Sequence, residues 1–175
     1  STIVIKKFVD KPLLSKGISN HKILGNWLCG GASNAGGSIL LDFFNLEYIK
    51  ELSHQINPSK STGIDLLPLS KKGERFPIDD PNLQPKLEPR PASDSLYLHA
   101  LLEGLAKIEA RGWQKLLELG VDLPKQIITI GGGSKNIAWK KIREKEIGIP
   151  IKLCNRPPAA GVAMIALKAL SLKKD

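Results

Sequence analysis

The sequence has few of the residues that stabilise a fold or build a site through covalent or metal chemistry. Its two cysteines, Cys29 and Cys154, are far apart, with no CxxC motif and no neighbouring histidine pair. Neither a disulfide framework nor a zinc site is therefore indicated, and we expect two buried thiols in a reducing cytoplasm. No apolar run approaches the ~20 residues that cross a bilayer, so no membrane span is expected.

Composition indicates an ordinary globular chain. Hydrophobic residues make up 42% of the 175 residues and charged residues 25%, which excludes global disorder and a fibrous structure. A chain of this length can bury a core without disulfides or metals. We therefore expect one domain spanning residues 1–175.

Positive charge exceeds negative charge. The 26 Lys and Arg residues against 17 Asp and Glu residues give a net charge of +9, which suits a polyanionic partner. The basic residues are scattered, however, and Glu103 with Lys107 has the i,i+4 spacing of a solvated helix face. The sequence also lacks RNP-type aromatic motifs and zinc-finger spacing, which counts against nucleic-acid binding. A non-catalytic module that binds nucleic acid or a protein through a basic face is therefore kept only as the alternative hypothesis.

The first part of the chain is expected to form two strands and a helix. Residues 2–6 and 22–29 are rich in β-branched and large apolar side chains, which predicts two strands of one sheet with a polar turn around residues 17–20. Apolar residues then recur at helical spacing over residues 35–52, with an interruption near Asn45. Residues 57–91 are rich in proline and predict a long irregular crossing that other parts must pin.

The second part alternates helices and strands. A helix is expected from Ser93, a favourable N-cap, to Gly120. Strands are predicted at residues 126–130 and 151–153, and helices at 136–146 and 158–172. This alternation is typical of an α/β sheet. Small residues in the last helix would allow it to approach the sheet closely.

Two glycine runs stand at strand-to-helix junctions, at residues 30–37 and 131–133. Such a junction gathers free backbone N–H groups and the positive end of a helix dipole, which suits an anionic ligand. The run at 131–133 lacks the Lys-Ser/Thr pair of a Walker motif, and Asn136 stands where a Rossmann motif needs Gly or Ala. A P-loop NTPase and an NAD-binding unit are therefore disfavoured.

Five segments in order resemble the C-terminal, ATP-side domain of the FGGY carbohydrate kinases, in the actin-like and hexokinase-like ATPase superfamily. Together they cover nearly the whole chain: residues 30–37 (GGASNAGG), 73–77 (GERFP, with DP at 80–81), 102–106 (LEGLA), 131–139 (GGGSKNIAW) and 158–163 (PAAGVA). The resemblance implies a ribonuclease-H-like α/β fold, with a mixed central sheet flanked by helices. The wording of the glycine segments is most like that of plant and cyanobacterial pentulose kinases.

The resemblance also implies an ATP site on the later glycine run. Gly132 and Gly133 would bring the backbone against the α-phosphate and the nucleoside, and Asn136 would hydrogen-bond the adenine edge. Mg²⁺ would bind mainly through the nucleotide phosphates. From the residues alone, the alternative role for Asn136 is an N-cap for its own helix.

The earlier segments would complete that site. Gly31 and the turn at Ala35 and Gly36 would line the other side of the base and ribose. Ser1 and Thr2 resemble the end of the family's second phosphate loop, near the β- and γ-phosphates. In the family the sugar, the catalytic Asp and the first phosphate loop come from sequence that precedes this domain, so we expect a fragment that is inactive alone.

The chain itself supplies no catalytic or metal-binding residue in this interpretation. None of its acidic residues matches the context of the family's catalytic base: Glu74, Asp42, Asp65, Asp79, Asp80 and Asp94. Phosphoryl transfer depends on positioning and charge neutralisation, which half of a cleft does not supply. D-ribulose or D-xylulose is the expected substrate of the intact enzyme, bound only through the missing N-terminal domain. Association between copies of the chain is a further expectation, because cut ends would expose apolar surface.

Overall fold

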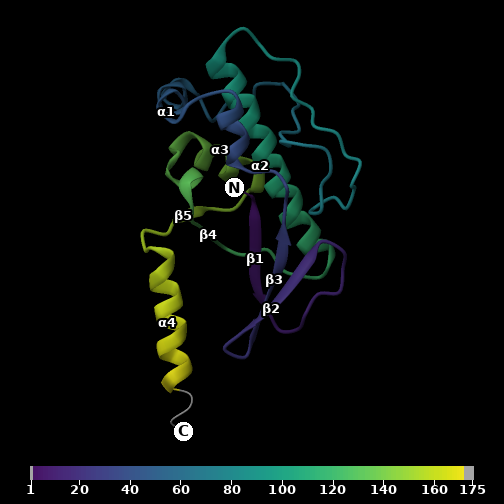
Figure 1. Ribbon diagram of the computed structural model, residues 1–175, viewed down its shortest axis with the longest axis vertical. Helices are drawn as coiled ribbons and strands as arrows, with labels where there is room; N and C mark the ends of the chain where they lie inside the picture. The colour runs from purple at the N-terminus through teal and green to yellow at the C-terminus, as the bar shows by residue number, and fades with distance from the viewer. Residues whose placement is uncertain (1, 172–175) are drawn as a thin grey trace.

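The computed structural model describes residues 2–171 and is shown in Figure 1. The chain begins with three antiparallel strands, β1 (Val4–Val9), β2 (Ile18–Ile23) and β3 (Asn26–Ala32), in the order β1-β3-β2. Residues 2–6 and 22–29 do contribute to one sheet, as predicted, but residues 22–29 are not a single strand, because they span the end of β2, a turn and the start of β3.

The polar turn predicted around residues 17–20 is wrong, because that segment begins β2. The turn instead lies at Leu24 and Gly25, both of which have positive φ, as a tight hairpin requires. Asn20 makes two hydrogen bonds to the backbone of Leu13. A polar side chain can therefore sit within this edge strand without a cost in unpaired groups.

Two short parallel strands, β4 (Ile127–Thr129) and β5 (Ile151–Leu153), form a second sheet. Backbone hydrogen bonds thus divide the strands into an antiparallel and a parallel group, although the sequence predicts a single mixed sheet. Packing joins the two groups, since Ile5 of β1, Ile127 of β4 and Ile151 of β5 lie in one buried cluster.

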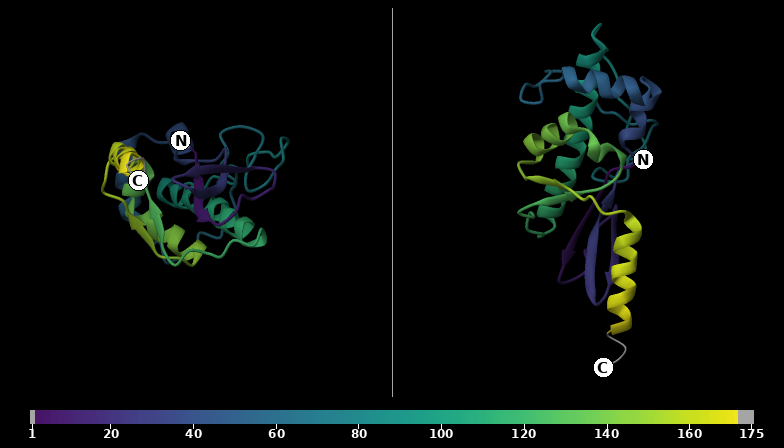
Figure 2. Two further views of the ribbon diagram at one scale, coloured as in Figure 1. Left: turned by 90° about the horizontal axis from the view of Figure 1, so that it is seen from below. Right: turned by 90° about the vertical axis from the view of Figure 1, so that its left-hand side faces the viewer.

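The long helix α2 (Asp94–Glu118) runs through the core and covers one face of the strands (Figure 2). The predicted N-cap is confirmed, because the side chain of Ser93 accepts a hydrogen bond from the Leu96 N–H. Leu98, Leu101 and other apolar residues along α2 have no exposed surface. The helix therefore has buried side chains around much of its circumference.

The predicted interruption near Asn45 is also confirmed. A 3₁₀ helix, η1 (Gly37–Asp42), precedes the helix α1 (Leu46–Gln55), and the Asn45 side chain caps α1 by accepting from the Tyr48 N–H at 2.8 Å.

The proline-rich crossing forms no helix or multi-residue strand, as expected, and other parts of the chain pin it. Arg90 lies 5.0 Å from the Tyr97 ring centroid and 5.9 Å from each of the Phe43 and Phe44 centroids, and it forms an ion pair with Asp94. Cation–π contacts of this kind hold the end of the crossing against α2 and η1.

Two helices complete the described chain. The helix α3 (Ile137–Ile147) packs beside α2, whereas α4 (Pro158–Ser171) projects away from the rest of the molecule (Figures 1 and 2). The expected close approach of α4 to the sheet is therefore wrong, since a Cβ added at Gly161 would meet nothing within 4 Å. Among the described helices, none is long and apolar enough to span a bilayer.

Candidate functional site

The later glycine run forms a tight turn directly after β4. Gly131 has φ +97°, a value that strains other residues, and its carbonyl accepts hydrogen bonds from the Ser134 N–H and hydroxyl. The 3₁₀ turn η2 (Gly132–Lys135) then leads into α3. Gly132 and Gly133 are exposed, so the turn presents bare main chain at the end of a strand.

The two exposed glycines differ in their surroundings. A Cβ built on Gly132 would meet nothing within 4 Å, whereas a Cβ on Gly133 would lie 2.2 Å from Cζ3 of Trp139. Gly133 is therefore required for the packing of a tryptophan that is itself 8% exposed. Gly132 has no such structural requirement and leaves space that a ligand could fill.

Asn136 has two structural roles. Its Oδ1 accepts from the Trp139 N–H at 2.9 Å and so caps α3, while its Nδ2 donates to the Ser53 hydroxyl at 2.8 Å. An asparagine side chain has two donor hydrogens and two acceptor lone pairs. One donor and one acceptor position therefore remain for a ligand such as an adenine edge.

The earlier glycine segment is buried. Gly31, Ala35 and Gly36 are all covered by neighbouring residues, and a Cβ on Gly31 would lie 2.2 Å from the Phe76 ring. Gly31 therefore allows an aromatic ring to pack against the backbone of β3. These three residues lie beneath the surface rather than on an open wall.

A buried carboxylate holds this segment in place. Glu74, 4% exposed, accepts from the Ser33 hydroxyl at 2.5 Å and from the Asn34 N–H at 2.7 Å. The Ser33 and Ile3 backbones are also hydrogen-bonded, and the Ile3 N–H donates to the Ala35 carbonyl at 2.8 Å. Glu74 lies in the segment at residues 73–77, but its role could not be read from the sequence because its partners are about forty residues away.

The start of the chain thus lies beside the earlier glycine segment, residues 30–37. Thr2 is exposed and directly precedes Ile3, which bonds to Ala35, while Ser1 lies outside the described residues. Trp139 and Ala35 belong to the same buried cluster. The structure therefore brings Trp139, which packs against the glycine turn, and Ala35 of the earlier glycine segment into one core.

Two surface cavities lie elsewhere, along α2. One of about 460 Å³ is lined by residues that include Lys107, Arg111 and Trp113. The other, of about 350 Å³, lies under the proline-rich crossing. Neither is lined by the predicted site residues, and among the described residues no group of three or more His, Cys, Asp or Glu side chains could hold a metal.

A pair of buried charges supports the strand that carries the glycine turn. Arg143 of α3 donates to both oxygens of Glu109 of α2, at 2.6 and 2.8 Å, and to the Thr129 hydroxyl at 3.0 Å. Thr129 is the last residue of β4, two residues before Gly131. The network therefore fixes β4 relative to both neighbouring helices.

The known proteins that this chain resembles in sequence and in structure are sugar kinases. No family model matches the chain. L-fuculokinase from Salmonella typhi is 33% identical over 70 residues, which are 39% of this chain and 15% of that protein. L-fuculokinase from Escherichia coli K12 is 31% identical over the same length. The sequence match thus covers only a small part of these relatives.

Solved structures match over far more of the chain. The xylulose kinase from Lactobacillus acidophilus superposes with a TM-score of 0.76 over 99% of this chain and 38% of its own, at 18% identity. The Plasmodium falciparum glycerol kinase solved with ADP gives 0.67 over 86% and 31%, also at 18% identity. The expected ribonuclease-H-like α/β fold is confirmed, and the chain spans about a third of the length of these kinases.

Proposed function

We propose that this chain is the nucleotide-binding half of an ATP-dependent sugar kinase. The observation that carries the proposal is the exposed glycine turn between β4 and α3, in a chain of which 99% superposes on a sugar kinase. A helix N-terminus preceded by bare backbone favours a phosphate group. The space beside Gly132 and the unused hydrogen-bonding positions of Asn136 suit a nucleotide laid across this turn.

In the proposed reaction the chain positions ATP, and a separate domain supplies the sugar and the base. Gly132 and Gly133 would contact the α-phosphate and the nucleoside, and Thr2 would lie near the terminal phosphates. Mg²⁺ would be held chiefly by phosphate oxygens, where it neutralises the charge that develops during transfer. Closure of the two halves would exclude water from the site.

The contacts of the acidic side chains in this chain favour a catalytic base that another domain supplies. Glu74 is buried and hydrogen-bonded, and Asp94 pairs with Arg90. Hydrogen bonds from Lys86 and Lys107 hold the pKa of Asp65 below its usual value. Each of these three carboxylates already has a partner within the chain, which favours the proposal that the chain alone transfers no phosphate.

A pentulose such as D-ribulose or D-xylulose is the proposed acceptor. The glycine segments resemble those of pentulose kinases, and several of the similar solved structures are xylulose kinases. A panel of sugars tested with the complete enzyme would decide this, and a preference for a hexulose or a polyol would contradict it.

Nucleotide titration followed by NMR tests the central proposal. We expect Mg·ADP to shift the amide signals of Gly132, Gly133 and Asn136. Gly132→Val should weaken binding at least tenfold, because its side chain fills the space that the phosphates need, while the fold tolerates it. Gly161→Ala adds a side chain in another open place and should leave affinity unchanged. Unperturbed signals in the turn, or sugar phosphorylation by the chain alone, would contradict the proposal.

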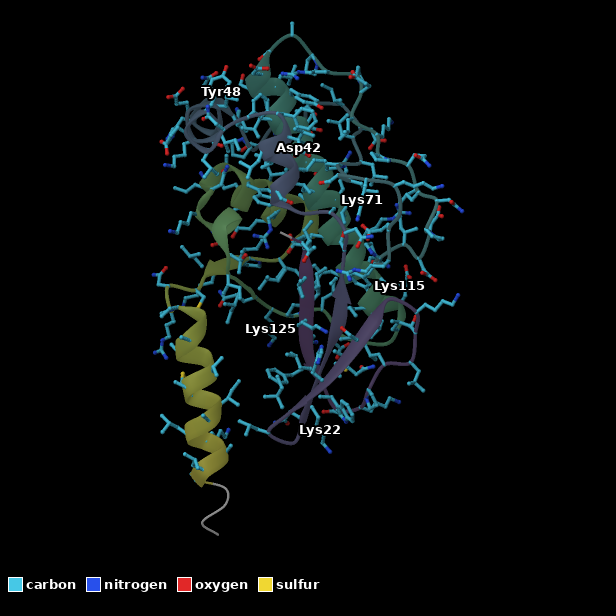
Figure 3. All side chains as sticks on the ribbon, in the orientation of Figure 1. Lys22, Asp42, Tyr48, Lys71, Lys115 and Lys125 are labelled. Carbon is cyan, nitrogen blue, oxygen red and sulfur yellow. The ribbon has the colours of Figure 1, made fainter. Side chains whose placement is uncertain are left out.

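A basic-face binding module remains the second candidate. Figure 3 shows four labelled lysines, at positions 22, 71, 115 and 125, on separate parts of the molecule rather than on one stripe. This dispersal favours the kinase proposal. Binding of DNA or RNA with steep salt dependence would favour the alternative.

A further inference from the structure

The glycine turn follows a strand that has few contacts of its own. The strand β4 has three residues and, among the described strands, pairs only with β5, which is equally short. Side chains alternate along a strand, so Ile128 and Ile130 are 67% and 65% exposed whereas Thr129 is 7% exposed. The exposed side of the strand that leads into Gly131 thus contributes little packing, and the position of the turn depends on contacts made from the buried side.

The contact on the buried side comes from the helix that follows the turn. The Thr129 hydroxyl accepts a hydrogen bond from Arg143 Nη1 at 3.0 Å. Thr129 is the last residue of β4, and Arg143 lies on α3, which begins directly after residues 130–136. This hydrogen bond therefore joins the two elements between which the glycine turn is suspended.

A carboxylate on a third element fixes the direction of this contact. Arg143 Nε and Nη2 donate to the two oxygens of Glu109 on α2, at 2.6 and 2.8 Å. Because a guanidinium group is planar, two hydrogen bonds to one carboxylate also set where its third nitrogen points. The side chains of Arg143 and Glu109 are 11% and 8% exposed, so water competes little for these bonds. The long helix α2 thereby holds Thr129 through Arg143.

We propose that Arg143 is a positioning residue for the glycine turn, acting through Thr129; this inference rests on the proposed nucleotide site. Arg143 is buried and would not touch the nucleotide itself. Groups that bind a ligand must be held within about 0.5 Å of their working geometry. A buried ion pair is seldom more stabilising than apolar side chains of similar volume. Stability alone therefore does not account for this pair, whereas a fixed turn does.

Thr129→Val tests the proposal, because it removes the hydroxyl that accepts from Arg143 and keeps the shape of the side chain. Titration with Mg·ADP should show affinity reduced about tenfold, the lower end of the range for supporting partners of metal ligands. The NMR amide signals of Gly132 and Gly133 should also shift in the variant before nucleotide is added. Thr129→Ser keeps the hydroxyl and should bind Mg·ADP as the wild type does.

Tyr97→Phe is the matched control for lost stability. The buried Tyr97 hydroxyl donates to the Leu87 carbonyl at 3.0 Å, between α2 and the proline-rich crossing. Its removal should lower the unfolding free energy in urea and leave both Mg·ADP affinity and the signals of the turn unchanged. An equal loss of affinity in Tyr97→Phe and Thr129→Val would reflect stability alone and would overturn the inference.

The titration separates this inference from the proposed function. If the wild type binds Mg·ADP and Thr129→Val binds it equally well, Arg143 does not position the turn, and the nucleotide site stands. If the wild type shows no binding, the proposed function fails and this inference fails with it.

Discussion

Asn136 and Ser53 are joined by a 2.8 Å hydrogen bond across 83 residues of sequence, and this bond ties the glycine turn to the end of α1. The Ser53 hydroxyl in turn donates to the Ile49 carbonyl at 2.6 Å. A residue predicted to contact adenine is therefore already part of the scaffold. Its ligand-binding role and its structural role must be separated by experiment.

Substitutions at Asn136 should rank by the number of contacts that they remove. Asn136→Ala loses the cap of α3 and the bond to Ser53, and should cost about 2 kcal/mol of unfolding free energy. Asn136→Asp keeps the capping oxygen and loses only the donor, so its cost should be smaller. Urea denaturation measures both. When Asn136→Ala is combined with Ser53→Ala, the loss of unfolding free energy should be smaller than the sum of the two single losses. Strict additivity would show that the hydrogen bond between Asn136 and Ser53 contributes nothing.

Alanine should destabilise the protein at one of the two exposed glycines and not at the other. Gly133→Ala places a methyl group 2.2 Å from the Trp139 ring and should cost about 1–3 kcal/mol through overpacking. Gly132→Ala should change stability little, because its Cβ points into open space. Thermal unfolding followed by circular dichroism checks this. Trp139→Leu should relieve the cost of Gly133→Ala, and equal melting of both alanine variants would contradict the packing argument.

The pair of Glu109 and Arg143 should be sensitive to loss of either partner. Their side chains are 8% and 11% exposed, so Glu109→Leu leaves a buried guanidinium without its carboxylate and should cost about 3–5 kcal/mol. The double variant Glu109→Leu with Arg143→Met removes both charges and should recover much of that loss. Arg143→Lys should also destabilise, because an ammonium group lacks the two-pronged geometry.

Chemical denaturation of the single and double variants measures this coupling. As a control, Glu47→Ala removes an exposed partner of Lys50 and should change the unfolding free energy little. If the double variant were no more stable than Glu109→Leu, Arg143 would not be the group left uncompensated.

Much of the local structure could be predicted from the sequence, since caps and alternation are local signals. Ser93 marks a helix start through its short polar side chain, an interruption is predicted near Asn45, and the proline-rich crossing is recognisable by composition. The clamp by Glu74 and the contact of Phe76 with Gly31 could not be predicted, because their partners are about forty residues away. The position of α4 was also missed, since small residues permit close packing without specifying the surface that is packed.

Stability should fall as the pH drops below neutrality, and His99 should be responsible. Its imidazole is 8% exposed, with Nε2 3.7 Å from Glu103 Oε1. Burial lowers the pKa of His99 from 6.5; Glu103 opposes this shift and Lys145 adds to it. The unfolded chain therefore binds more protons than the native chain just below pH 6.5, so acidification favours unfolding. The contribution is fully present above pH 6.5 and is lost as the pH falls toward the lowered native value.

Denaturant unfolding at several pH values between about pH 8 and about pH 5 measures how the unfolding free energy depends on pH. A single titrating group can change that free energy by at most about 1.4 kcal/mol per pH unit. Asp65 stays ionised over that range, because hydrogen bonds from Lys86 and Lys107 hold its pKa below the ordinary value of 3.8. His99→Gln should flatten the dependence, whereas His54→Gln, at an exposed position on α1, should preserve it. An unchanged slope in His99→Gln would assign the proton uptake to another group.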